Sequence, residues 1–234
     1  MPDARVLAVR QFVKATPTSR ILRLELDAPF RFQAGQAARI GVPGQTTRKP
    51  YSIASAPEDA EREGCLEFLV KVDADGRPPP HLAGARRGAR VAVEGPLGTF
   101  RFPRRPAGRA VLFVAGGTGI APMRSMLRHA LSARYAGRLI VLYSARSERE
   151  FAYGAELRQL ARRGSIELRL TATRQAAQTW RGQRGRINLA SLADLGVDRT
   201  TLCFICGPPT LLAAARPLLE RMGVPASHVR MDKW

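Results

Sequence analysis

A glycine-rich turn lies directly between a strand pattern and a helix pattern in this sequence, and it limits the possible folds more than any other segment. The uncharged run Ala110 to Ala115 is typical of a strand buried on both faces, and helical spacing of apolar residues extends from Met123 to Arg134. Between them stands Ala115-Gly116-Gly117-Thr118-Gly119-Ile120-Ala121-Pro122. A strand that leads through a tight turn into a helix is the repeating unit of a parallel sheet covered by helices.

The rest of the second half repeats this alternation, which predicts an α/β domain with a parallel sheet over residues 109–234. Apolar runs typical of buried strands alternate with segments of helical spacing. The predicted strands are Leu139 to Tyr143, Ile166 to Thr171 and Leu202 to Cys206, and the predicted helices are Phe151 to Arg162 and Leu211 to Met222.

The first hundred residues instead contain short strand patterns separated by glycine and proline. In Ser19 to Leu26, leucines at every second position alternate with Arg23 and Glu25, which is the period of a half-buried strand. This pattern predicts a small antiparallel barrel or sandwich over residues 1–101, followed by a linker at 102–108. The other predicted strands are Val6 to Val13, Ala37 to Val42, Leu66 to Val72 and Arg90 to Val93.

The composition argues against several classes of protein. No run of about 18 uncharged apolar residues occurs, so we predict no membrane span, and the charged N-terminal segment is not that of a secretory signal. Three cysteines are too few for a disulfide framework, a four-cysteine iron-sulfur cluster or an all-cysteine zinc site. We therefore expect a cytoplasmic monomer without a metal site. The histidines, which make no metal spacing and are expected on the surface, are His81, His129 and His228.

The net charge of +19 points to an anionic partner. Residues 101–234 carry 23 basic and 8 acidic residues, so most of the excess lies in the second half. The partner could be nucleic acid, a phosphorylated cofactor or an acidic protein. No basic run interleaved with aromatic residues and no nucleic-acid motif occurs, so nucleic acid is not expected. Because 34 of the 38 basic residues are arginines, a single arginine indicates little by itself.

The glycine-rich turn has the chemistry of a pyrophosphate site. Gly116, Gly117 and Gly119 carry no Cβ, which lets the backbone approach a ligand closely, and the free N–H groups at the start of the helix attract a phosphate. The turn lacks the Gly-Lys-Ser/Thr ending of a P-loop and is not the common Gly-x-Gly-x-x-Gly pattern. The alternative is a tight turn that binds no ligand.

A second candidate binding segment in the first half is Arg48-Lys49-Pro50-Tyr51-Ser52. On an extended strand Lys49 and Tyr51 share a face, so a cation can bind a phosphate while the aromatic ring packs on a planar ligand. Taken alone, the segment is explained equally well as an exposed edge strand.

Four motifs follow one another along nearly the whole chain. They are Lys49-x-Tyr51-Ser52, Gly95-Pro96-Leu97-Gly98-x-Phe100, Gly116-Gly117-Thr118-Gly119-x-x-Pro122 and Cys206-Gly207-Pro208-Pro209. Their order and spacing resemble the ferredoxin-NADP reductase family. The turn Gly76-x-x-x-Pro80-x-Leu82 and the final Trp234 make the chain most similar to the short bacterial ferredoxin/flavodoxin-NADP reductases.

The resemblance implies an N-terminal antiparallel Greek-key β-barrel that binds FAD and a C-terminal α/β domain that binds NADP(H), with hydride transfer between the cofactors. By the same resemblance Tyr51 would pack on the isoalloxazine, Ser52 would lie near its reactive N5, and Cys206 would lie near the nicotinamide. Trp234 would stack on the flavin, or else be a tail residue. These four are the candidate catalytic residues. The candidate FAD-binding residues are Arg48, Lys49, Pro50, Tyr51, Ser52, Phe68, Leu69, Val70, Lys71, Gly76 and Arg77. The candidate NADP-binding residues are Gly116, Gly117, Thr118, Gly119, Pro122, Ala145, Arg146, Thr173, Arg174, Arg186, Cys206, Gly207 and Pro208, and Trp234 is a further candidate cofactor-binding residue through its stacking on the flavin.

Two positions depart from the family pattern. The arginine that usually stands two residues before the tyrosine is Lys49, which offers a point charge without a bidentate fork, and Arg48 is a possible substitute. The serine of the second pyrophosphate loop is missing from Gly76-Arg77-Pro78-Pro79-Pro80, and proline supplies neither a hydroxyl nor an N–H. Unless Arg77 replaces the lost contact, the pattern favours a flavin that dissociates.

Arginines near predicted strand ends favour NADP(H) over NAD(H). Arg146 follows one strand, Arg174 follows the next, and Arg186 stands in Gly-Arg-Ile. NADP sites place arginine at the 2′-phosphate, whereas NAD sites place an acid near the ribose hydroxyls. Glu148 and Glu150 lie close enough to Arg146 to keep NADH open as the coenzyme.

The segment Cys203-Phe204-Ile205-Cys206 has the Cys-x-x-Cys spacing that occurs in redox and metal sites. On a strand, positions three apart face opposite sides, so the sulfurs diverge. We therefore predict that Cys203 packs in the core.

The working hypothesis is a flavin oxidoreductase that transfers a hydride between NADPH and FAD and single electrons to or from an acidic ferredoxin or flavodoxin. The alternatives are a reductase component of an oxygenase and an NAD(P)H:flavin reductase with a dissociable flavin. A nucleic-acid-binding protein that retains a nucleotide fold is a more distant alternative.

Overall fold

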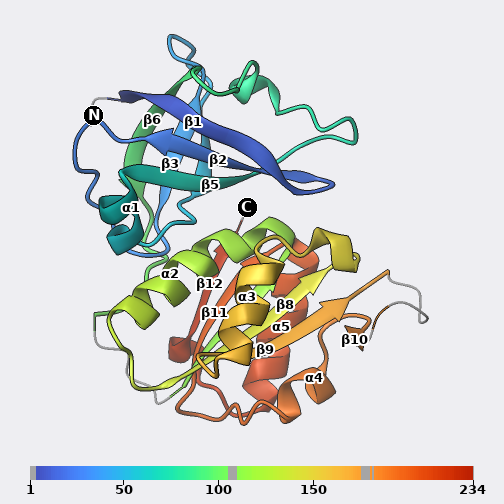
Figure 1. Cartoon of the computed structure of the whole chain (residues 1–234). Helices are drawn as coiled ribbons and strands as arrows, with labels where there is room; N and C mark the ends of the chain where they lie inside the picture. Colours follow the sequence, from blue (N-terminus) through green and yellow to red (C-terminus); the bar gives the residue numbers. More distant parts are fainter. Residues whose placement is uncertain (1–3, 105–109, 175–179, 181, 234) are drawn as a thin grey trace. The chain divides into compact units, whose positions relative to one another are not determined.

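In the computed structural model, the described residues are 4–104, 110–174, 180 and 182–233. The chain divides into two compact units (Figure 1). The first unit comprises Met1–Phe102 and Arg124–Ala133, and the second comprises Pro103–Met123 and Arg134–Trp234. Most of the predicted linker, residues 105–108, lies outside the described residues.

The first unit is an antiparallel six-stranded sheet that closes on itself. Its strand order is β4-β3-β6-β1-β2-β5, which is a Greek-key arrangement. The two end strands meet where Ile53 bridges Phe68 and the Ala54 N–H donates to the Glu67 carbonyl over 2.7 Å, so the predicted barrel is confirmed. Its elements are β1 (Arg5–Thr16), β2 (Ser19–Glu25), β3 (Ala37–Gly41), β4 (Lys49–Ser52), α1 (Pro57–Glu63), β5 (Cys65–Lys71) and β6 (Arg90–Leu97).

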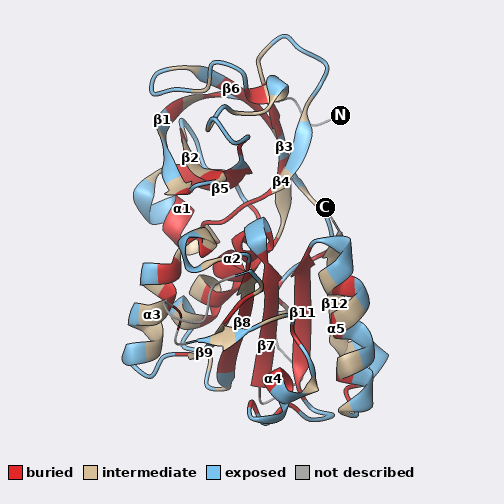
Figure 2. Cartoon of the chain, turned by 90° about the vertical axis from the view of Figure 1, so that its right-hand side faces the viewer, coloured by how far each residue is buried: buried red, intermediate tan, exposed pale blue. Residues whose placement is uncertain are grey.

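The barrel core follows from the period-two pattern of its strands. Leu22 and Leu24 are fully buried and pack with Leu66, Phe68 and the other inward side chains of the barrel. Figure 2 shows buried residues in red along the barrel strands, among intermediate and exposed ones.

The second unit is a parallel six-stranded sheet with strand order β10-β9-β8-β7-β11-β12, and the predicted α/β domain is confirmed. All residues of β7 are buried, as expected for a central strand of a parallel sheet. Its strands are β7 (Ala110–Gly116), β8 (Arg138–Ala145), β9 (Glu167–Ala172), β10 (Gln183–Arg184), β11 (Leu202–Gly207) and β12 (Val229–Lys233). Its helices are α3 (Gly154–Arg162), α4 (Leu189–Ala193) and α5 (Pro209–Arg221), and α2 (Ile120–Ser132) begins in this unit.

The two faces of the sheet carry different side chains. Leu112 and Val114 of β7 share a buried cluster with residues of α4 and α5. On the other face, Phe113 stacks on Phe204 with ring centroids 5.7 Å apart, and Tyr143 meets Phe151, which precedes α3. Both faces are therefore buried, which explains why the strands read as continuous apolar runs.

Two predicted helix starts were wrong by three residues. Helix α2 begins at Ile120 rather than Met123, because the glycine turn leads directly into it and Pro122 is tolerated in the first turn. Helix α3 begins at Gly154 rather than Phe151, because Tyr153 adopts a left-handed conformation with φ of 58°. The short elements α1, α4, β10 and β12 had no predicted counterpart, since so few residues show no readable period.

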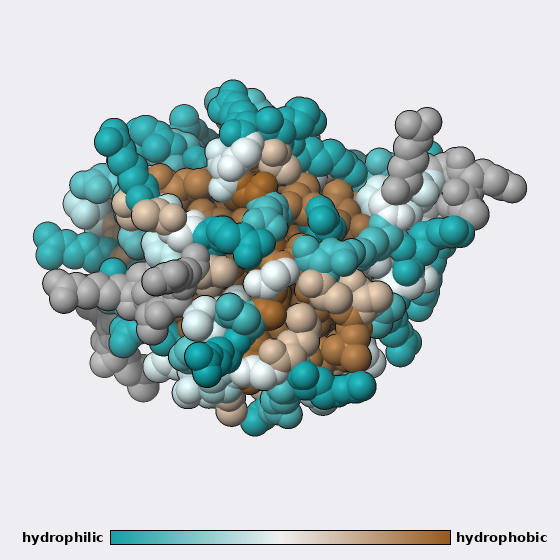
Figure 3. Space-filling view, turned by 90° about the horizontal axis from the view of Figure 1, so that it is seen from below, coloured by the Kyte–Doolittle hydropathy of each residue, from teal (hydrophilic) through white to brown (hydrophobic). Residues whose placement is uncertain are grey.

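The surface mixes apolar and hydrophilic side chains. Figure 3 shows hydrophilic side chains around the margin of one face and apolar ones gathered nearer its middle. Among the described residues, the large hydrophobic side chains that are clearly exposed are Val6 and Val13. None of the helices in the described part of the chain has the length and apolar character that a membrane-spanning helix requires.

Candidate functional site

The predicted flavin segment forms β4, an end strand of the barrel. Lys49 and Pro50 are exposed, Tyr51 is half-buried, and Ser52 is buried with 6% of its surface exposed. Within the described residues the Ser52 hydroxyl has no hydrogen-bond partner. Leaving such a group unpaired costs about 1–3 kcal/mol, which indicates that a ligand completes its bonding.

Tyr51 is held by a residue that sequence reasoning did not place in the site. Its hydroxyl lies 2.9 Å from His81 Nε2, and the two ring centroids are 5.7 Å apart. Burial raises the pKa of Tyr51 to about 12, so it remains a neutral phenol. Burial and then the charge of Lys49 lower the pKa of His81, which favours the neutral imidazole. The signal available in the sequence was the position of His81 in the Gly76 to Leu82 turn.

The basic residues proposed for the flavin site differ in their surroundings. Arg48 Nε lies 3.4 Å from a carboxylate oxygen of Glu94, which also pairs with Arg39, so its guanidinium is engaged by β6. Arg77 is highly exposed; its guanidinium lies 4.0 Å from the equally exposed Asp75 carboxylate, and its backbone N–H donates to the Asp73 carboxylate over 2.8 Å. This leaves Lys49 as the exposed cation of β4 and Arg77 as the exposed cation of the proline-rich turn.

The predicted flavin-lining strand is β5, at the opposite end of the strand order from β4. Phe68, Leu69 and Val70 are buried and Lys71 is exposed. Among the described strands, β5 pairs along its length only with β2 and meets the β4 side at the Ile53 bridge. Its backbone beyond Phe68 is therefore available on that side to a planar ligand.

The glycine-rich turn is fixed tightly in the second unit. A Cβ on Gly119 would lie 2.2 Å from the carbonyl oxygen of Cys206, so the close approach requires glycine. Gly117 has φ of 56° and open space around its Cβ position, and Thr118 beside it is exposed. The Tyr143 hydroxyl donates to the Gly117 carbonyl over 2.9 Å. Gly116, which is buried, precedes these exposed residues. Together the turn residues form a preformed backbone site for a phosphate at the start of α2.

The three candidate 2′-phosphate arginines are brought together at one edge of the sheet. The Thr173 N–H donates to the Ala145 carbonyl and the Arg174 N–H to the Arg146 carbonyl, over 2.9 and 2.8 Å. The Gly185 N–H donates to the Ala172 carbonyl over 3.0 Å, which places Arg186 beside the same strand ends. All three arginine side chains are exposed.

The surroundings of these arginines favour an anion. Glu148, one of the two acids that kept NADH open as the coenzyme, lies 3.4 Å from Arg158 of α3. A polar pocket of about 190 Å³ is lined in part by Arg184, Arg186 and Asn188. A larger cavity of about 560 Å³, lined by residues 26–32 and α1, contains none of the predicted site residues.

The cysteines of β11 differ in their surroundings. Cys203 belongs to the apolar cluster under α5, as predicted, and burial raises the pKa of its thiol to about 12. Cys206 is fully buried and pairs in register with Ala115, next to the glycine turn. The buried Gly207 and the exposed Pro208 lead from it into α5. Trp234 lies outside the described residues.

Comparison with known families and proteins covers both units. Residues 7–102 match the oxidoreductase FAD-binding domain and residues 113–217 match the oxidoreductase NAD-binding domain. The chain is 35% identical to ferredoxin–NADP reductase B of Sorangium cellulosum, over 99% of this chain and 97% of that protein. It is 31% identical to the ferredoxin–NAD(P)(+) reductase component of the naphthalene 1,2-dioxygenase/salicylate 5-hydroxylase systems of a Ralstonia species, over 94% of this chain and 66% of that protein.

A solved structure has the same fold. The ferredoxin NADP+ reductase from Neisseria gonorrhoeae, with bound FAD and NADP, superposes with a TM-score of 0.83 at 21% identity, covering 100% of this chain and 99% of that chain. The residues described above fit these cofactors: a buried unpartnered hydroxyl beside an aromatic ring and a cation suits a flavin, and a backbone cradle beside clustered arginines suits a phosphorylated nucleotide.

Proposed function

Because the chain belongs to the ferredoxin-NADP reductase family of FAD- and NAD(P)-binding oxidoreductases, we propose that it transfers a hydride between NADPH and FAD and exchanges single electrons with a separate acidic ferredoxin or flavodoxin. The observation that carries the redox assignment is the buried, unpartnered Ser52 hydroxyl beside Tyr51. We further propose that residues 1–101 bind FAD, 102–108 link the domains and 109–234 bind the nicotinamide nucleotide.

When bound, FAD supplies the redox chemistry, since it accepts two electrons together and releases them singly. The protein supplies binding and orientation. Tyr51, held by His81, offers a ring face, the Ser52 hydroxyl offers a hydrogen bond, and Lys49 offers a positive charge. Hydride transfer itself needs no general acid or base, so this chemistry does not require a histidine-carboxylate pair among the proposed residues.

The proposal is tested by the visible spectrum of the purified protein, followed without oxygen during addition of NADPH and, separately, NADH. We expect a flavin spectrum that bleaches faster with NADPH. A colourless protein that also fails to bind added FAD would reject the redox function. Equal bleaching by both coenzymes would reject the preference for NADPH.

The proposed acidic partner rests on charge. Residues 101–234 carry 23 basic and 8 acidic residues, a field that would steer an acidic carrier toward the protein. Electron transfer to a ferredoxin or flavodoxin should then slow steeply as ionic strength rises, because salt screens the encounter. A rate independent of salt would reject an acidic carrier.

Arg174→Ala should raise the KM for NADPH about tenfold and leave the KM for NADH nearly unchanged, since it removes one charge-assisted hydrogen bond to the 2′-phosphate. Steady-state kinetics with both coenzymes measure this. Arg169→Ala is the matched control, because Arg169 is an exposed arginine within β9, the strand that Arg174 follows. Equal losses with both coenzymes would show that Arg174 does not read the 2′-phosphate.

Lys49→Ala should weaken FAD binding about tenfold, because it removes the exposed cation of β4 from the proposed pyrophosphate site. The flavin-to-protein ratio after gel filtration measures the effect. Lys14→Ala, which removes an exposed lysine of β1, should retain its flavin. Equal flavin contents in the two variants would remove Lys49 from the site.

A second candidate is an NAD(P)H-dependent reductase that releases its flavin or serves an oxygenase. The turn Gly76 to Pro80 supports weak flavin binding, because its prolines offer no hydrogen-bond donor and Arg77 is highly exposed. Similarity to a dioxygenase reductase component supports the oxygenase role. FAD that elutes separately on gel filtration and is then turned over as a substrate would favour this candidate.

A further inference from the structure

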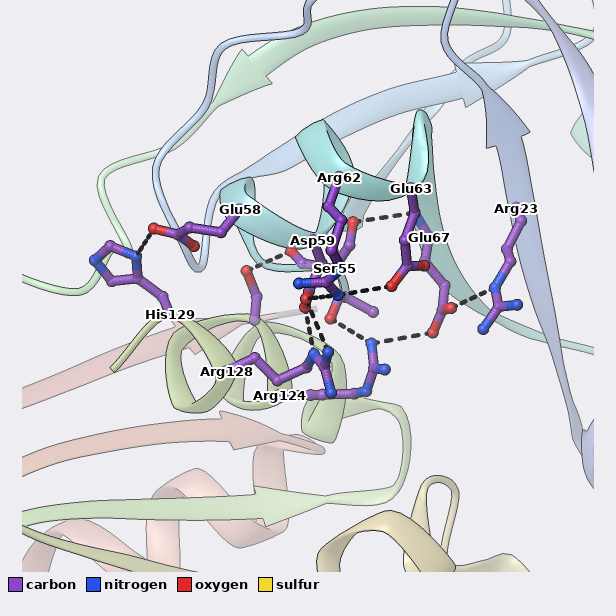
Figure 4. A network of polar contacts seen from close by, with 12 residues as sticks. Arg23, Ser55, Glu58, Asp59, Arg62, Glu63, Glu67, Arg124, Arg128 and His129 are labelled. Carbon is purple, nitrogen blue, oxygen red and sulfur yellow. Dashed lines mark hydrogen bonds and ion pairs between the residues drawn. The ribbon is translucent and has the colours of Figure 1, made fainter. Parts of the chain in front are cut away.

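Helix α2 is joined to the barrel by side chains that end on the segment following Ser52. Arg124 donates to the Ala54 carbonyl over 2.9 Å and to the Glu67 carboxylate over 3.2 Å. The neighbouring Ser125 hydroxyl donates to the Ser55 carbonyl over 2.8 Å and accepts the Gly35 N–H over 3.2 Å. Figure 4 shows Arg124 and Glu67 pointing toward one another from α2 and the barrel.

These contacts are buried and reinforce one another. The side chains of Arg124 and Glu67 are 10% and 4% exposed, and Ser125 is fully buried. Glu67 also binds Arg23 of β2 over 2.6 Å, and its backbone N–H donates to the Ser55 hydroxyl over 3.2 Å. Because these groups are largely shielded from water, each one relies on the others for its hydrogen bonds, and the positions of the side chains are therefore closely defined.

The network fixes the chain on the carboxyl side of the flavin strand. Ala54 is held at both its N–H, by Glu67, and its carbonyl, by Arg124. Ser55 is held at its carbonyl and at its hydroxyl. Ser52 lies two residues before Ala54, so rotation of the Ser52 backbone is limited by these anchors.

We propose that Arg124 and Ser125 are positioning residues that set the direction of the Ser52 hydroxyl through the anchored segment Ala54-Ser55. This inference rests on the proposed flavin function. Helix α2 would then have two roles. Its start, after the glycine-rich turn, would contribute to nucleotide binding, and Arg124 and Ser125 would hold the flavin strand in the geometry that hydride transfer requires.

Arg128, one helical turn further along α2, provides a matched control. It forms an ion pair with Asp59 of α1 and donates to the other carboxylate oxygen over 2.8 Å. Burial raises the pKa of Asp59, but hydrogen bonds and charges from Arg128 and then Arg62 outweigh it and lower that pKa to about 2. Arg128 thus joins the same helix to the barrel through Asp59 of α1.

The test compares Arg124→Lys with Arg128→Lys in the full chain with bound FAD. Lysine keeps the charge but is a shorter side chain, so its ammonium cannot occupy the place of Arg124 Nη1, the atom that donates to both Ala54 and Glu67. At saturating NADPH, the rate constant of flavin reduction should fall about tenfold in Arg124→Lys, because a small displacement of a reacting group is costly. The NADPH concentration at half-maximal rate should not change. Arg128→Lys should lose stability without losing rate.

Unchanged rates in both variants, or equal losses of rate in both, would overturn the inference. Should Arg124→Lys fail to fold, Ser125→Ala takes its place in the same comparison with the same criterion. Failure of NADPH to reduce the flavin in the unaltered chain would reject the proposed function instead. In that case visible circular dichroism of bound FAD still decides: the signal should change in Arg124→Lys and not in Arg128→Lys, and identical signals would overturn the inference.

Discussion

Replacing Ser52 by alanine is expected to slow flavin reduction by NADPH about a hundredfold while leaving the FAD-free protein no less stable. The rate falls because one preorganised hydrogen-bond donor is lost from the proposed flavin site, a change that typically costs that much. Stability is retained because the buried hydroxyl has no partner among the described residues, so its removal ends a desolvation penalty of about 1–3 kcal/mol and breaks no hydrogen bond. Stopped-flow reduction and urea unfolding measure the two quantities.

Ser19→Ala is the control, for which we expect a loss of stability and no loss of the flavin reduction rate. Ser19 is also a buried serine of the barrel, but its hydroxyl lies 2.7 Å from that of Thr16. Losing this hydrogen bond should lower the free energy of unfolding by about 1 kcal/mol, with the reduction rate unchanged. If Ser52→Ala instead lost stability and kept its rate, the Ser52 hydroxyl would be a structural group and not part of the flavin site.

Replacing Gly119 by alanine is expected to destabilise the second unit by about 3 kcal/mol, at the upper end of the range for overpacking. The added Cβ would lie 2.2 Å from the Cys206 carbonyl oxygen and 2.8 Å from the Gly207 nitrogen, and these backbone atoms cannot turn aside. The turn must therefore open, which should raise the KM for NADPH sharply. Urea unfolding and steady-state kinetics test both effects.

Gly117→Ala is the control within the same turn. Nothing lies within 4 Å of its Cβ position, and only the left-handed φ of 56° opposes the substitution. The expected loss of stability is about 1 kcal/mol. Equal losses at the two positions would mean that close packing against β11 does not hold the turn.

Much of the fold was readable from local patterns. The period-two leucines of Ser19 to Leu26 predicted a barrel strand, and the apolar run at Ala110 predicted the central strand of the parallel sheet. Helix starts at Ile120 and Gly154 were missed, because they depend on the backbone conformations of the preceding residues.

Features that depend on neighbouring residues could be predicted from the sequence: the two-part organisation, the glycine turn, the Lys49 to Ser52 segment and the arginines at strand ends. The contacts between distant side chains became visible in the folded chain. His81 reaches Tyr51 across 30 positions, and Arg124 reaches Glu67 across 57. A local sequence pattern does not predict such a contact. The chain has 34 arginines, and nothing in the sequence distinguishes Arg124 from the others; its distinguishing features are its burial and its ion pair with the buried Glu67 carboxylate, which appear only in the folded chain.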